Sequence, residues 1–324
     1  MRNNSLGKLF EVSALTLGGG GIGQVWGETS QEEAIATVRD AYSAGIRLFD
    51  MAPLYGDGEA ERVMGLAFAD GYPADLRLTT KCMVGAIPRE QIEARLRDSL
   101  TASLARLARD YVDVYILHGY IIPDGWQATT RPRALPHIAV EYSTYRDIVI
   151  PVFESLMASG KIGAFGITAA STQVTNVAAV ENSPAPALVQ CIANVLDSPG
   201  NMAITEETAK PREVIQASKA QGVGVMGIRA VAAGALATAI DRVVKPNSAE
   251  AKDFARAGEF RRLAAAMDTT PAKLAHRYAL SMPGVDTVVL GVKNRHELLE
   301  SLQAEAQPRF TNDEMKEIDQ QVTG

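Results

Sequence analysis

Short apolar runs alternate with longer amphipathic stretches along most of this 324-residue chain. A short, mostly apolar run is typical of a strand that is buried on both faces, as in a parallel sheet. The pattern predicts eight such strands, at residues 14–17, 46–49, 76–80, 112–117, 163–167, 187–192, 223–228 and 287–290.

The stretches between these strands carry apolar residues at helical spacing. They predict helices at residues 31–43, 59–69, 89–107, 145–158, 172–180, 211–220, 259–280 (interrupted at Pro271) and 295–303, and a last helix at residues 312–322. Gly45, Gly160 and Gly222 stand just after three of these helices, where a left-handed cap favours glycine.

Eight strands, each followed by a helix, predict an α/β fold of the (β/α)8 barrel type. The length would accommodate two domains of about 150 residues each. No linker or internal repeat divides the chain, however, so we expect a single barrel domain over residues 1–324. The long segments 119–144 and 229–258 follow the fourth and seventh strands and are expected to form loops on the face where barrel active sites lie.

A run of glycines after the first strand offers the spacing G-x-G-x-x-G at Gly18, Gly20 and Gly23. A dinucleotide-binding turn of this kind requires a helix that opens on the glycines. Residues 24–30 are loop-like, and the next predicted helix begins only near Ser30. The run is therefore interpreted as a flexible loop, with a Rossmann turn as the less favoured alternative.

The composition excludes several classes of function. A net charge of −6 gives no support for a nucleic-acid partner. Cys82 and Cys191 cannot build a disulfide framework, and neither they nor the four histidines have metal-ligand spacing. No apolar stretch has the length of a membrane span, and the N-terminus lacks the apolar region of a signal peptide. We expect a cytoplasmic protein without a metal site.

Polar residues stand at the ends of three consecutive predicted strands. Asp50 ends the second strand, Lys81 the third and His118 the fourth, and Tyr55 follows Asp50 by five residues. Singly, such residues are common as caps, packing residues or solvated charges. Together they predict one site, because buried charges are costly unless they are paired.

These residues stand in segments that resemble the aldo-keto reductase superfamily over nearly the whole chain. The matching segments are residues 48–59, 80–81, 113–118, 160–168, 189–194 and 222–229. The resemblance implies a catalytic tetrad of Asp50, Tyr55, Lys81 and His118. Tyr55 would be the general acid or base at the carbonyl oxygen, and a neighbouring Lys81, positioned by Asp50, should lower its pKa. His118 would orient the substrate oxygen, and a nicotinamide would supply hydride.

The resemblance also implies a nicotinamide cofactor in an extended groove over the barrel. Its carboxamide would contact Thr168 and Gln190, although Ala169 replaces the asparagine that many members have. The other implied cofactor residues are Ile228, Arg229, Gly291, Lys293, Glu297 and Glu300. Glu297 favours NAD, because it would repel a 2′-phosphate, whereas Lys293 and Arg295 favour NADP. We expect NADP(H) or NAD(H), with a slight preference for NADP(H).

The expected partner is a small carbonyl compound or its alcohol. Trp26, Tyr120 and Trp126 are candidate aromatic walls for it. The chain resembles the bacterial aldose-dehydrogenase branch more than the steroid or prostaglandin branch, and this likeness favours a sugar or another hydroxylated carbonyl. Two alternatives remain: a cofactor-binding, redox-sensing or scaffold barrel with little turnover, and a Schiff-base aldolase that uses Lys81.

Overall fold

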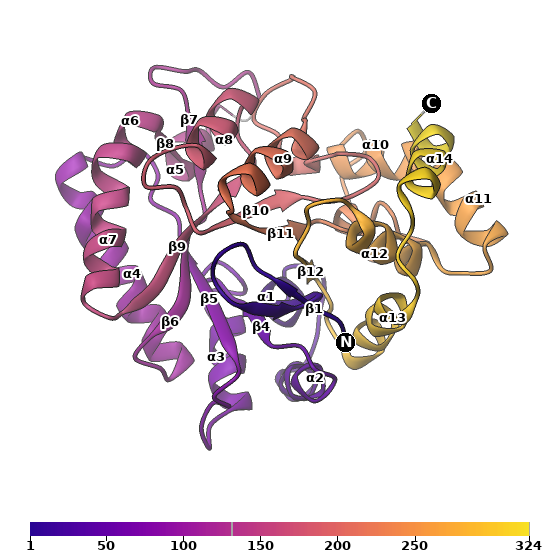
Figure 1. The fold of residues 1–324 in the computed structure, drawn as a ribbon, viewed down its shortest axis with the longest axis horizontal. Coiled ribbons are helices and arrows are strands. Elements are labelled where there is room, and N and C mark those ends of the chain that lie inside the picture. Colours follow the sequence, from indigo (N-terminus) through magenta and orange to yellow (C-terminus); the bar gives the residue numbers. More distant parts are fainter. Residues whose placement is uncertain (131, 324) are drawn as a thin grey trace.

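The computed structural model describes residues 1–130 and 132–323, and its centre is a closed barrel of parallel strands (Figure 1). The strands follow one another around the barrel in chain order, and the last pairs with the first. They are β3 (Leu15–Gly18), β4 (Leu48–Asp50), β5 (Arg77–Cys82), β6 (Val112–Leu117), β9 (Ile162–Ala169), β10 (Leu188–Ile192), β11 (Gly224–Ile228) and β12 (Thr287–Leu290). The predicted (β/α)8 barrel is confirmed, with every strand boundary within two residues of its prediction.

Helices surround this barrel on all sides (Figure 1). The helices that follow the eight strands are α2 (Gln31–Ser43), α3 (Glu59–Ala67), α4 (Ile92–Leu107), α7 (Ile150–Ala158), α8 (Gln173–Val180), α9 (Pro211–Gln221), α12 (Pro271–Ser281) and α13 (Arg295–Ala306). The helix predicted at residues 259–280 is divided at Pro271 into α11 (Gly258–Ala266) and α12, as expected. The predicted C-terminal helix is α14 (Asn312–Thr323).

Side-chain caps fix where several of these helices begin. Ser30, Thr172, Thr270 and Asn294 each accept a hydrogen bond from the backbone N–H three residues later. Such caps satisfy N–H groups that have no partner within the helix. At the opposite end of α9, Gly222 adopts φ +71°, the left-handed cap that its position in the sequence predicts.

The sequence pattern did not predict the N-terminal hairpin of β1 (Asn3–Ser5) and β2 (Glu11–Ser13). The hairpin lies across one end of the barrel (Figure 1). Its Leu6 and Val12 are buried against inward-facing strand residues, among them Val114 and Met226. The strand β1 is exposed and polar, so it has no apolar run from which a strand could be predicted.

The two long segments contain elements of their own. The segment after β6 holds β7 (Tyr120–Ile122), α5 (Leu135–Ile138) and β8 (Ala139–Glu141), and leads into α6 (Tyr142–Thr144) and η2 (Tyr145–Val149). The segment after β11 holds η4 (Ala232–Gly234) and α10 (Ala249–Arg256). Two further short turns are η1 (Arg89–Gln91) and η3 (Gly200–Met202).

The glycine run forms one turn of helix, α1 (Gly19–Ile22), so the interpretation of this run as a loop was wrong. All four residues are buried. A Cβ on Gly21 would lie 2.0 Å from the carbonyl oxygen of Val292, and one on Gly18 would lie 2.4 Å from that of Leu290. The glycines are therefore required by a close approach to the end of β12, and the barrel excludes the Rossmann alternative.

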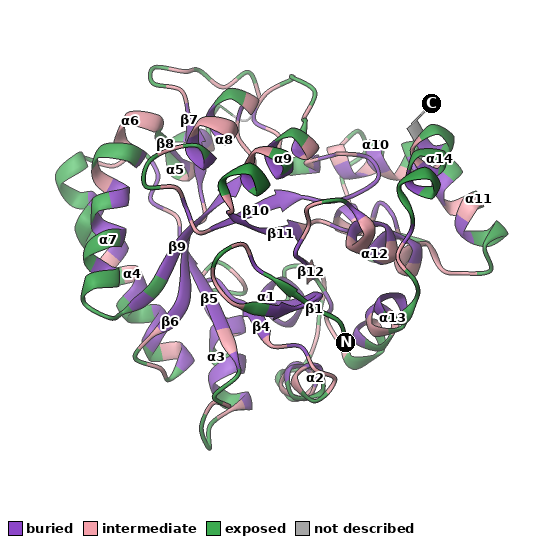
Figure 2. Ribbon diagram, in the orientation of Figure 1, coloured by how far each residue is buried: buried purple, intermediate pink, exposed green. Residues whose placement is uncertain are grey.

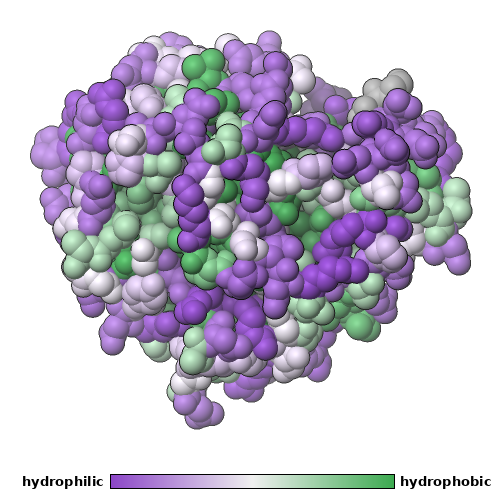
Figure 3. Space-filling model, in the orientation of Figure 1, coloured by the Kyte–Doolittle hydropathy of each residue, from purple (hydrophilic) through white to green (hydrophobic). Residues whose placement is uncertain are grey.

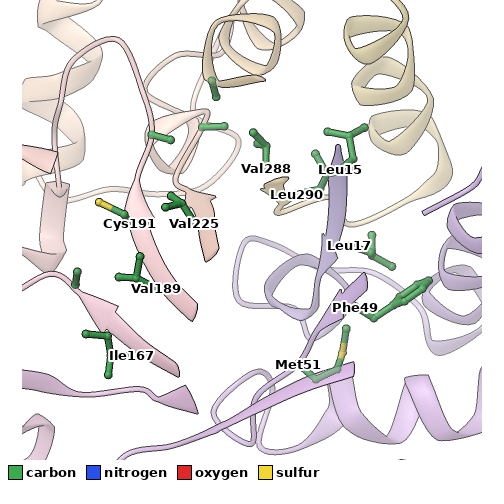
Figure 4. Close-up of a cluster of buried hydrophobic side chains, with 14 of the residues drawn as sticks. Leu15, Leu17, Phe49, Met51, Ile167, Val189, Cys191, Val225, Val288 and Leu290 are labelled. Atoms are coloured by element: carbon green, nitrogen blue, oxygen red, sulfur yellow. The ribbon is translucent and has the colours of Figure 1, made fainter. Parts of the chain in front are cut away.

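The main hydrophobic core lies between the strands and the helices. Alternate strand residues such as Leu17, Phe49, Val189, Val225 and Val288 contribute to it (Figure 4). The strands are buried along most of their length, while exposed residues gather on the outer faces of the helices (Figure 2). On the face seen in Figure 3, hydrophilic residues cover most of the surface and hydrophobic ones lie in the recesses between them. Within the described residues, no helix has the length and apolar character needed to cross a membrane.

Candidate active site

The barrel brings the four predicted catalytic residues to one end of its strands. Asp50 is the last residue of β4, Lys81 the last but one of β5, and His118 follows β6 directly. These strands are neighbours in the barrel, with Asp50 paired to Thr79 and Lys81 to Ile116.

Lys81 is the centre of this cluster and has no solvent exposure. Its Nζ donates hydrogen bonds to Asp50 Oδ2 (2.8 Å), to the Met51 carbonyl oxygen (2.9 Å) and to the Tyr55 hydroxyl oxygen (3.0 Å). The second oxygen of Asp50 accepts from the Thr79 hydroxyl at 2.5 Å. The three protons of the ammonium group thus have three acceptors, which satisfies a buried cation.

His118 packs beside Tyr55, with the two ring centroids 5.7 Å apart and the ring planes at 88°. Its backbone N–H donates to the carbonyl of Cys82 and continues the pairing of the two strands. Its Nδ1 is buried, and no residue in the part of the chain that the structure describes forms a hydrogen bond with it. The expected cluster therefore forms, but the contact between Tyr55 and His118 is one of ring packing.

Burial sets the pKa values of these groups. Burial raises the pKa of Tyr55 and outweighs the opposing effect of the Lys81 charge, so the net shift is upward. This corrects the expectation of a lowered pKa, although Lys81 acts in the expected direction. Burial alone would lower the pKa of Lys81, but Asp50 and Tyr55 raise it above its ordinary value. The lysine is therefore charged and the phenol protonated at neutral pH.

The imidazole of His118 is neutral at neutral pH. Burial, with a smaller contribution from the Lys81 charge, lowers the pKa of His118 to about 3. A neutral imidazole has one nitrogen that donates and one that accepts a hydrogen bond. His118 can therefore bind a substrate oxygen without adding a charge to the site.

These residues open into a groove with a volume of about 810 Å³. Lys81 lies beneath it, while Asp50, Tyr55 and His118 line it. The eight residues predicted to contact a cofactor all line the same groove: Thr168, Gln190, Ile228, Arg229, Gly291, Lys293, Glu297 and Glu300. Residues from remote parts of the sequence thus share one surface.

Of the predicted substrate residues, Trp26 and Tyr120 line the groove. The Trp26 indole nitrogen would lie 2.7 Å from a Cβ on Gly20, so a side chain larger than glycine has no room there. Trp126 is not among the lining residues; it packs on the apolar cluster that includes Tyr120 and Ile138.

The side-chain amide of Gln190, which lines the groove, is only partly satisfied by hydrogen bonds. Thr168 Oγ1 donates a long hydrogen bond, 3.4 Å, to Gln190 Oε1. The Gln190 Nε2 group is buried and has no hydrogen-bond partner among the described residues. An orphaned buried donor costs free energy unless a ligand satisfies it. Thr168 and Gln190 therefore fit a planar amide such as the carboxamide of a nicotinamide.

Arg229 lines the groove at the end of β11. Its backbone adopts φ +61°, and its Nε and Nη2 atoms are buried without partners. Burial lowers the pKa of Arg229, and the nearby Glu250 and Asp253 oppose that effect. Strained backbone and unpaired guanidinium nitrogens at one residue are typical of a binding site for an anion.

The far end of the groove carries several charged groups. Lys293 Nζ lies 2.5 Å from Asp241 Oδ2 and 2.6 Å from Glu297 Oε1. Arg295 is exposed and does not line the groove; it forms a two-pronged ion pair with Glu33. Glu300 accepts a hydrogen bond from the Thr270 hydroxyl. Lys293 and Arg295, the two cations that favoured a 2′-phosphate in the sequence, are thus already paired with carboxylates. A third cation, Arg242, lines the groove and donates to the carbonyl oxygen of Ala233.

Sequence reasoning missed several residues of this site. Thr79 holds Asp50, and Asp241 reaches Lys293 from the segment after β11. His276 lines the far end, and its buried Nδ1 has no partner. Thr79 lies on a barrel strand two residues before Lys81, which could have suggested it. Asp241 and His276 had no such signal, because only the folded chain brings them to the groove.

Comparisons with known proteins identify the family of this chain. Residues 14–322 match the sequence model of the Aldo/keto reductase family. The chain belongs to this family. A curated relative, the L-galactose dehydrogenase of Arabidopsis thaliana, is 28% identical over 297 residues, which are 91% of this chain and 85% of the relative.

Solved structures of the same family share the fold. An aldo-keto reductase from Bacillus halodurans in its holo form has a TM-score of 0.70 and 22% identity, covering all of this chain and 97% of that one. The glycerol dehydrogenase of Gluconobacter oxydans has a TM-score of 0.70 and 20% identity, covering 98% and 94%. Membership of the family indicates oxidoreduction between carbonyl compounds and alcohols with NAD(P).

Proposed function

We propose that this protein interconverts an aldehyde or ketone and its alcohol, with Tyr55 as the general acid or base. The observation that carries the proposal is the hydrogen bond from the fully buried Lys81 ammonium to the Tyr55 hydroxyl oxygen, 3.0 Å long, at the wall of the groove. A nicotinamide held by the groove residues would supply hydride to the carbonyl carbon, or would accept it from the alcohol in the reverse direction. The oxygen then needs a proton, and Tyr55 donates it.

Lys81 and Asp50 prepare this proton transfer. When the phenol loses its proton, the phenolate forms 3.0 Å from an ammonium group, which stabilises the negative charge. Asp50 Oδ2 holds the ammonium in place from the other side, and Thr79 holds Asp50. In the direction of alcohol oxidation, the phenolate accepts the proton again.

His118 orients the substrate in this proposal. Its ring stands edge-on to Tyr55, and its imidazole is neutral because burial lowers its pKa to about 3. A neutral donor beside the phenol fixes the carbonyl oxygen between two hydrogen-bonding groups. We therefore assign positioning of the substrate to His118 and proton transfer to Tyr55.

The groove fits an extended dinucleotide in this proposal. The unpaired amide of Gln190, with Thr168, suits the carboxamide, and the unpaired nitrogens of Arg229 suit the pyrophosphate. Ile228 contributes an apolar surface next to Arg229, and Gly291 leaves room at the end of β12. These residues bind and orient the cofactor.

We further propose that NAD(H) is the preferred cofactor. Lys293 and Arg295 are the residues that favour NADP(H) in the sequence, but both are paired with carboxylates. Glu297 and Glu300 line the same end of the groove and would repel a 2′-phosphate. A carboxylate is instead a good acceptor for a 2′-hydroxyl group.

A redox-sensing or scaffold barrel with little turnover is the alternative function. It would bind the same nucleotide but would not need a protonated phenol next to a buried ammonium. A Schiff-base aldolase would need an uncharged, accessible lysine. Lys81 has no solvent exposure, and its pKa is raised, which disfavours this reaction.

The deciding experiment measures turnover with aldehydes, ketones and sugars, each with NADH and NADPH, and in reverse with the alcohols. We expect one nucleotide oxidised for each alcohol formed, with NADH giving the higher kcat/KM. Binding of NADH without turnover of any carbonyl would support the scaffold alternative. Inactivation by borohydride in the presence of a carbonyl substrate, with an adduct at Lys81, would support the aldolase.

A further inference from the structure

Thr79 is bonded to the cluster of Asp50, Lys81 and Tyr55. Side chains alternate between the two faces of a strand, so Thr79 shares a face with Lys81, two residues later on β5. Its Oγ1 donates a hydrogen bond of 2.5 Å to Asp50 Oδ1, while Lys81 Nζ donates to Asp50 Oδ2. Thr79 and Lys81 have no solvent exposure, and Asp50 has 1%. Each oxygen of this buried carboxylate thus has its own donor.

The two donors share one negative charge. Hydrogen bonds in a buried network influence one another, so a carboxylate that is well bonded at one oxygen attracts a donor at the other oxygen less strongly. Burial raises the pKa of Tyr55 most, the Lys81 charge lowers it, and the Asp50 charge raises it. A hydrogen bond that stabilises the Asp50 carboxylate therefore favours the phenolate of Tyr55, because it leaves more of the Lys81 charge to the phenol.

The backbone of Thr79 serves the same lysine. Its carbonyl oxygen accepts a hydrogen bond of 3.0 Å from the Met51 N–H, and the Met51 carbonyl oxygen accepts from Lys81 Nζ. Thr79 is also the residue that pairs with Asp50 between β4 and β5. Thr79 thus fixes two of the three acceptors of Lys81, and a substitution of its side chain removes only the contact with Asp50.

We propose that the Thr79 hydroxyl sets how readily Tyr55 exchanges its proton, by bonding Asp50 and so leaving the Lys81 charge to the phenol. This inference rests on the proposed role of Tyr55 as general acid or base and adds a positioning residue to it. Thr79 does not line the groove, so it acts through Asp50 and Lys81 and not on the substrate.

The next residue of β5 offers a matched control. Thr80 Oγ1 donates a hydrogen bond of 2.5 Å to Glu61 Oε1, and Glu61 pairs with Arg106. Thr80 and Glu61 have no solvent exposure and do not line the groove. The two neighbouring threonines therefore make the same kind of bond, from a hydroxyl to a buried and paired carboxylate, but only the bond of Thr79 leads to Tyr55.

Few ionisable groups face Tyr55. Lys81 comes from β5, Asp50 from β4, and His118, which is neutral, follows β6. The helix α1, which packs against the ring through Gly19, contains no ionisable side chain. Both acidic residues of α3 are already paired with arginines, Glu59 with Arg62 and Glu61 with Arg106.

Thr79→Val replaces the hydroxyl with a methyl group and should raise the pKa of Tyr55. A hydrogen bond to a charged group changes a pKa by about one to two units, and part of this effect reaches Tyr55 through Lys81. The phenolate fraction then falls at any pH below that pKa. At pH 8, kcat/KM for oxidation of propan-1-ol, or of the best alcohol in the turnover screen, should therefore fall about three- to ten-fold, with the Kd of NADH unchanged within about two-fold.

Two further variants identify the hydroxyl as the cause. Thr79→Ser keeps the hydroxyl and should stay within about two-fold of the parental kcat/KM. Thr80→Val should keep the parental kcat/KM, although its urea midpoint should fall about as far as that of Thr79→Val, since each leaves a buried carboxylate one donor short. If Thr79→Val does not fold, Thr79→Cys replaces it, because a thiol is a weaker donor than a hydroxyl and should lower kcat/KM in the same direction.

The nitrogen NMR signal of the Lys81 ammonium group gives a readout that needs no turnover. It is assigned by its absence in Lys81→Met, and it should move in Thr79→Val but not in Thr80→Val. The proposal is overturned if this signal keeps its position in Thr79→Val, if Thr79→Val keeps the parental kcat/KM, or if Thr80→Val loses as much activity. If the signal moves in Thr79→Val alone but the parent turns over no alcohol or carbonyl, the link from Thr79 to Lys81 stands and the proposed reaction fails.

Discussion

The two ends of the groove differ in how their charged side chains are buried and paired. At the catalytic end, the Lys81 ammonium group is fully buried. It donates hydrogen bonds to Asp50, to the Met51 carbonyl oxygen and to Tyr55. At the far end, the Lys293 side chain is 13% exposed and stands between Asp241, 54% exposed, and Glu297, 31% exposed. The first arrangement has one satisfied state, whereas the second can exchange partners with a ligand or with water.

This difference indicates which properties each end can control. A buried, fully bonded ammonium fixes the position and charge of the catalytic phenol, and any change there disturbs both folding and chemistry. The partly exposed charges at the far end contribute less to folding, and they can select among nucleotides by attraction and repulsion. Substitutions at the two ends should therefore have separable effects.

The largest effect on stability is expected for Asp50→Asn. Removal of this carboxylate leaves the Lys81 ammonium buried without a counter-charge, which should lower the free energy of unfolding by about 3–5 kcal/mol. Activity should fall as well, because the ammonium loses its position. Urea denaturation and steady-state kinetics measure the two effects.

Glu61→Gln is the matched control for that variant. Glu61 is also fully buried, and it pairs with Arg106 and accepts from Thr80, but it does not line the groove. The control should lose stability and keep its kcat. A loss of kcat in Glu61→Gln as great as in Asp50→Asn would show that loss of a buried carboxylate lowers activity wherever it lies, and not through the position of Lys81.

The next effect concerns cofactor choice. Glu297→Arg removes one carboxylate from Lys293 and adds a cation at the far end. The ratio of kcat/KM for NADPH to that for NADH should rise roughly ten- to hundred-fold, as expected for one charge-assisted hydrogen bond to a phosphate. Glu90→Arg makes the same charge change at an exposed position on η1 and should leave the ratio unchanged. An unchanged ratio in Glu297→Arg would show that Glu297 does not face the nucleotide.

The pH dependence separates the two directions of the reaction. Burial raises the pKa of Tyr55, so the acid form needed for carbonyl reduction persists throughout the neutral range. Alcohol oxidation needs the phenolate, whose fraction increases ten-fold per pH unit below the pKa. The kcat/KM for oxidation should thus rise about ten-fold from pH 7 to pH 8, while that for reduction stays flat.

Titration of His118 should cause no inflection in these pH profiles, because burial lowers its pKa to about 3 and the imidazole stays neutral across the measured range. An inflection near pH 6.5 in the parent protein that disappears in His118→Gln would show that the imidazole titrates in the neutral range. Such a profile would mean that the His118 imidazole is protonated in part of the neutral range, which would contradict its role as a neutral hydrogen-bonding group.

The smallest effect is expected for Arg295→Ala. Arg295 is exposed and forms an ion pair with Glu33, an arrangement that contributes little in water. The Kd of either nucleotide, measured by fluorescence titration, should change by less than about three-fold. A ten-fold weaker binding of NADPH alone would indicate that Arg295 leaves Glu33 to contact the 2′-phosphate.

The sequence predicted the barrel and the proximity of Asp50, Tyr55, Lys81 and His118, because both follow from local patterns. Apolar runs mark the strands, and parallel strands of a barrel end on one face. The upward shift in the pKa of Tyr55 could not be predicted, since it depends on how deeply the folded chain buries the ring. The one-turn helix at Gly19–Ile22 depends in the same way on the approach of β12.

The ion pairs of Lys293 and Arg295 could not be predicted from the sequence either. Lys293 and Arg295 read as free cations along the chain, but Asp241 and Glu33 reach them from segments 52 and 262 residues away. Trp126 had the appearance of a groove residue because it lies in a long loop after a strand. Its contacts are with the apolar cluster of that loop. Side-chain pairing between remote segments leaves no trace in a local pattern.

The most direct test of the central claim is a comparison of Tyr55→Phe with Tyr142→Phe. Tyr142 donates its hydroxyl proton to the Ala178 carbonyl and does not line the groove. We predict that Tyr55→Phe lowers kcat for carbonyl reduction by roughly 10²–10⁴-fold, with the Kd of NADH unchanged within about two-fold, and that Tyr142→Phe keeps the parental kcat. A Tyr55→Phe variant with kcat within ten-fold of the parent would show that this phenol does not supply the proton.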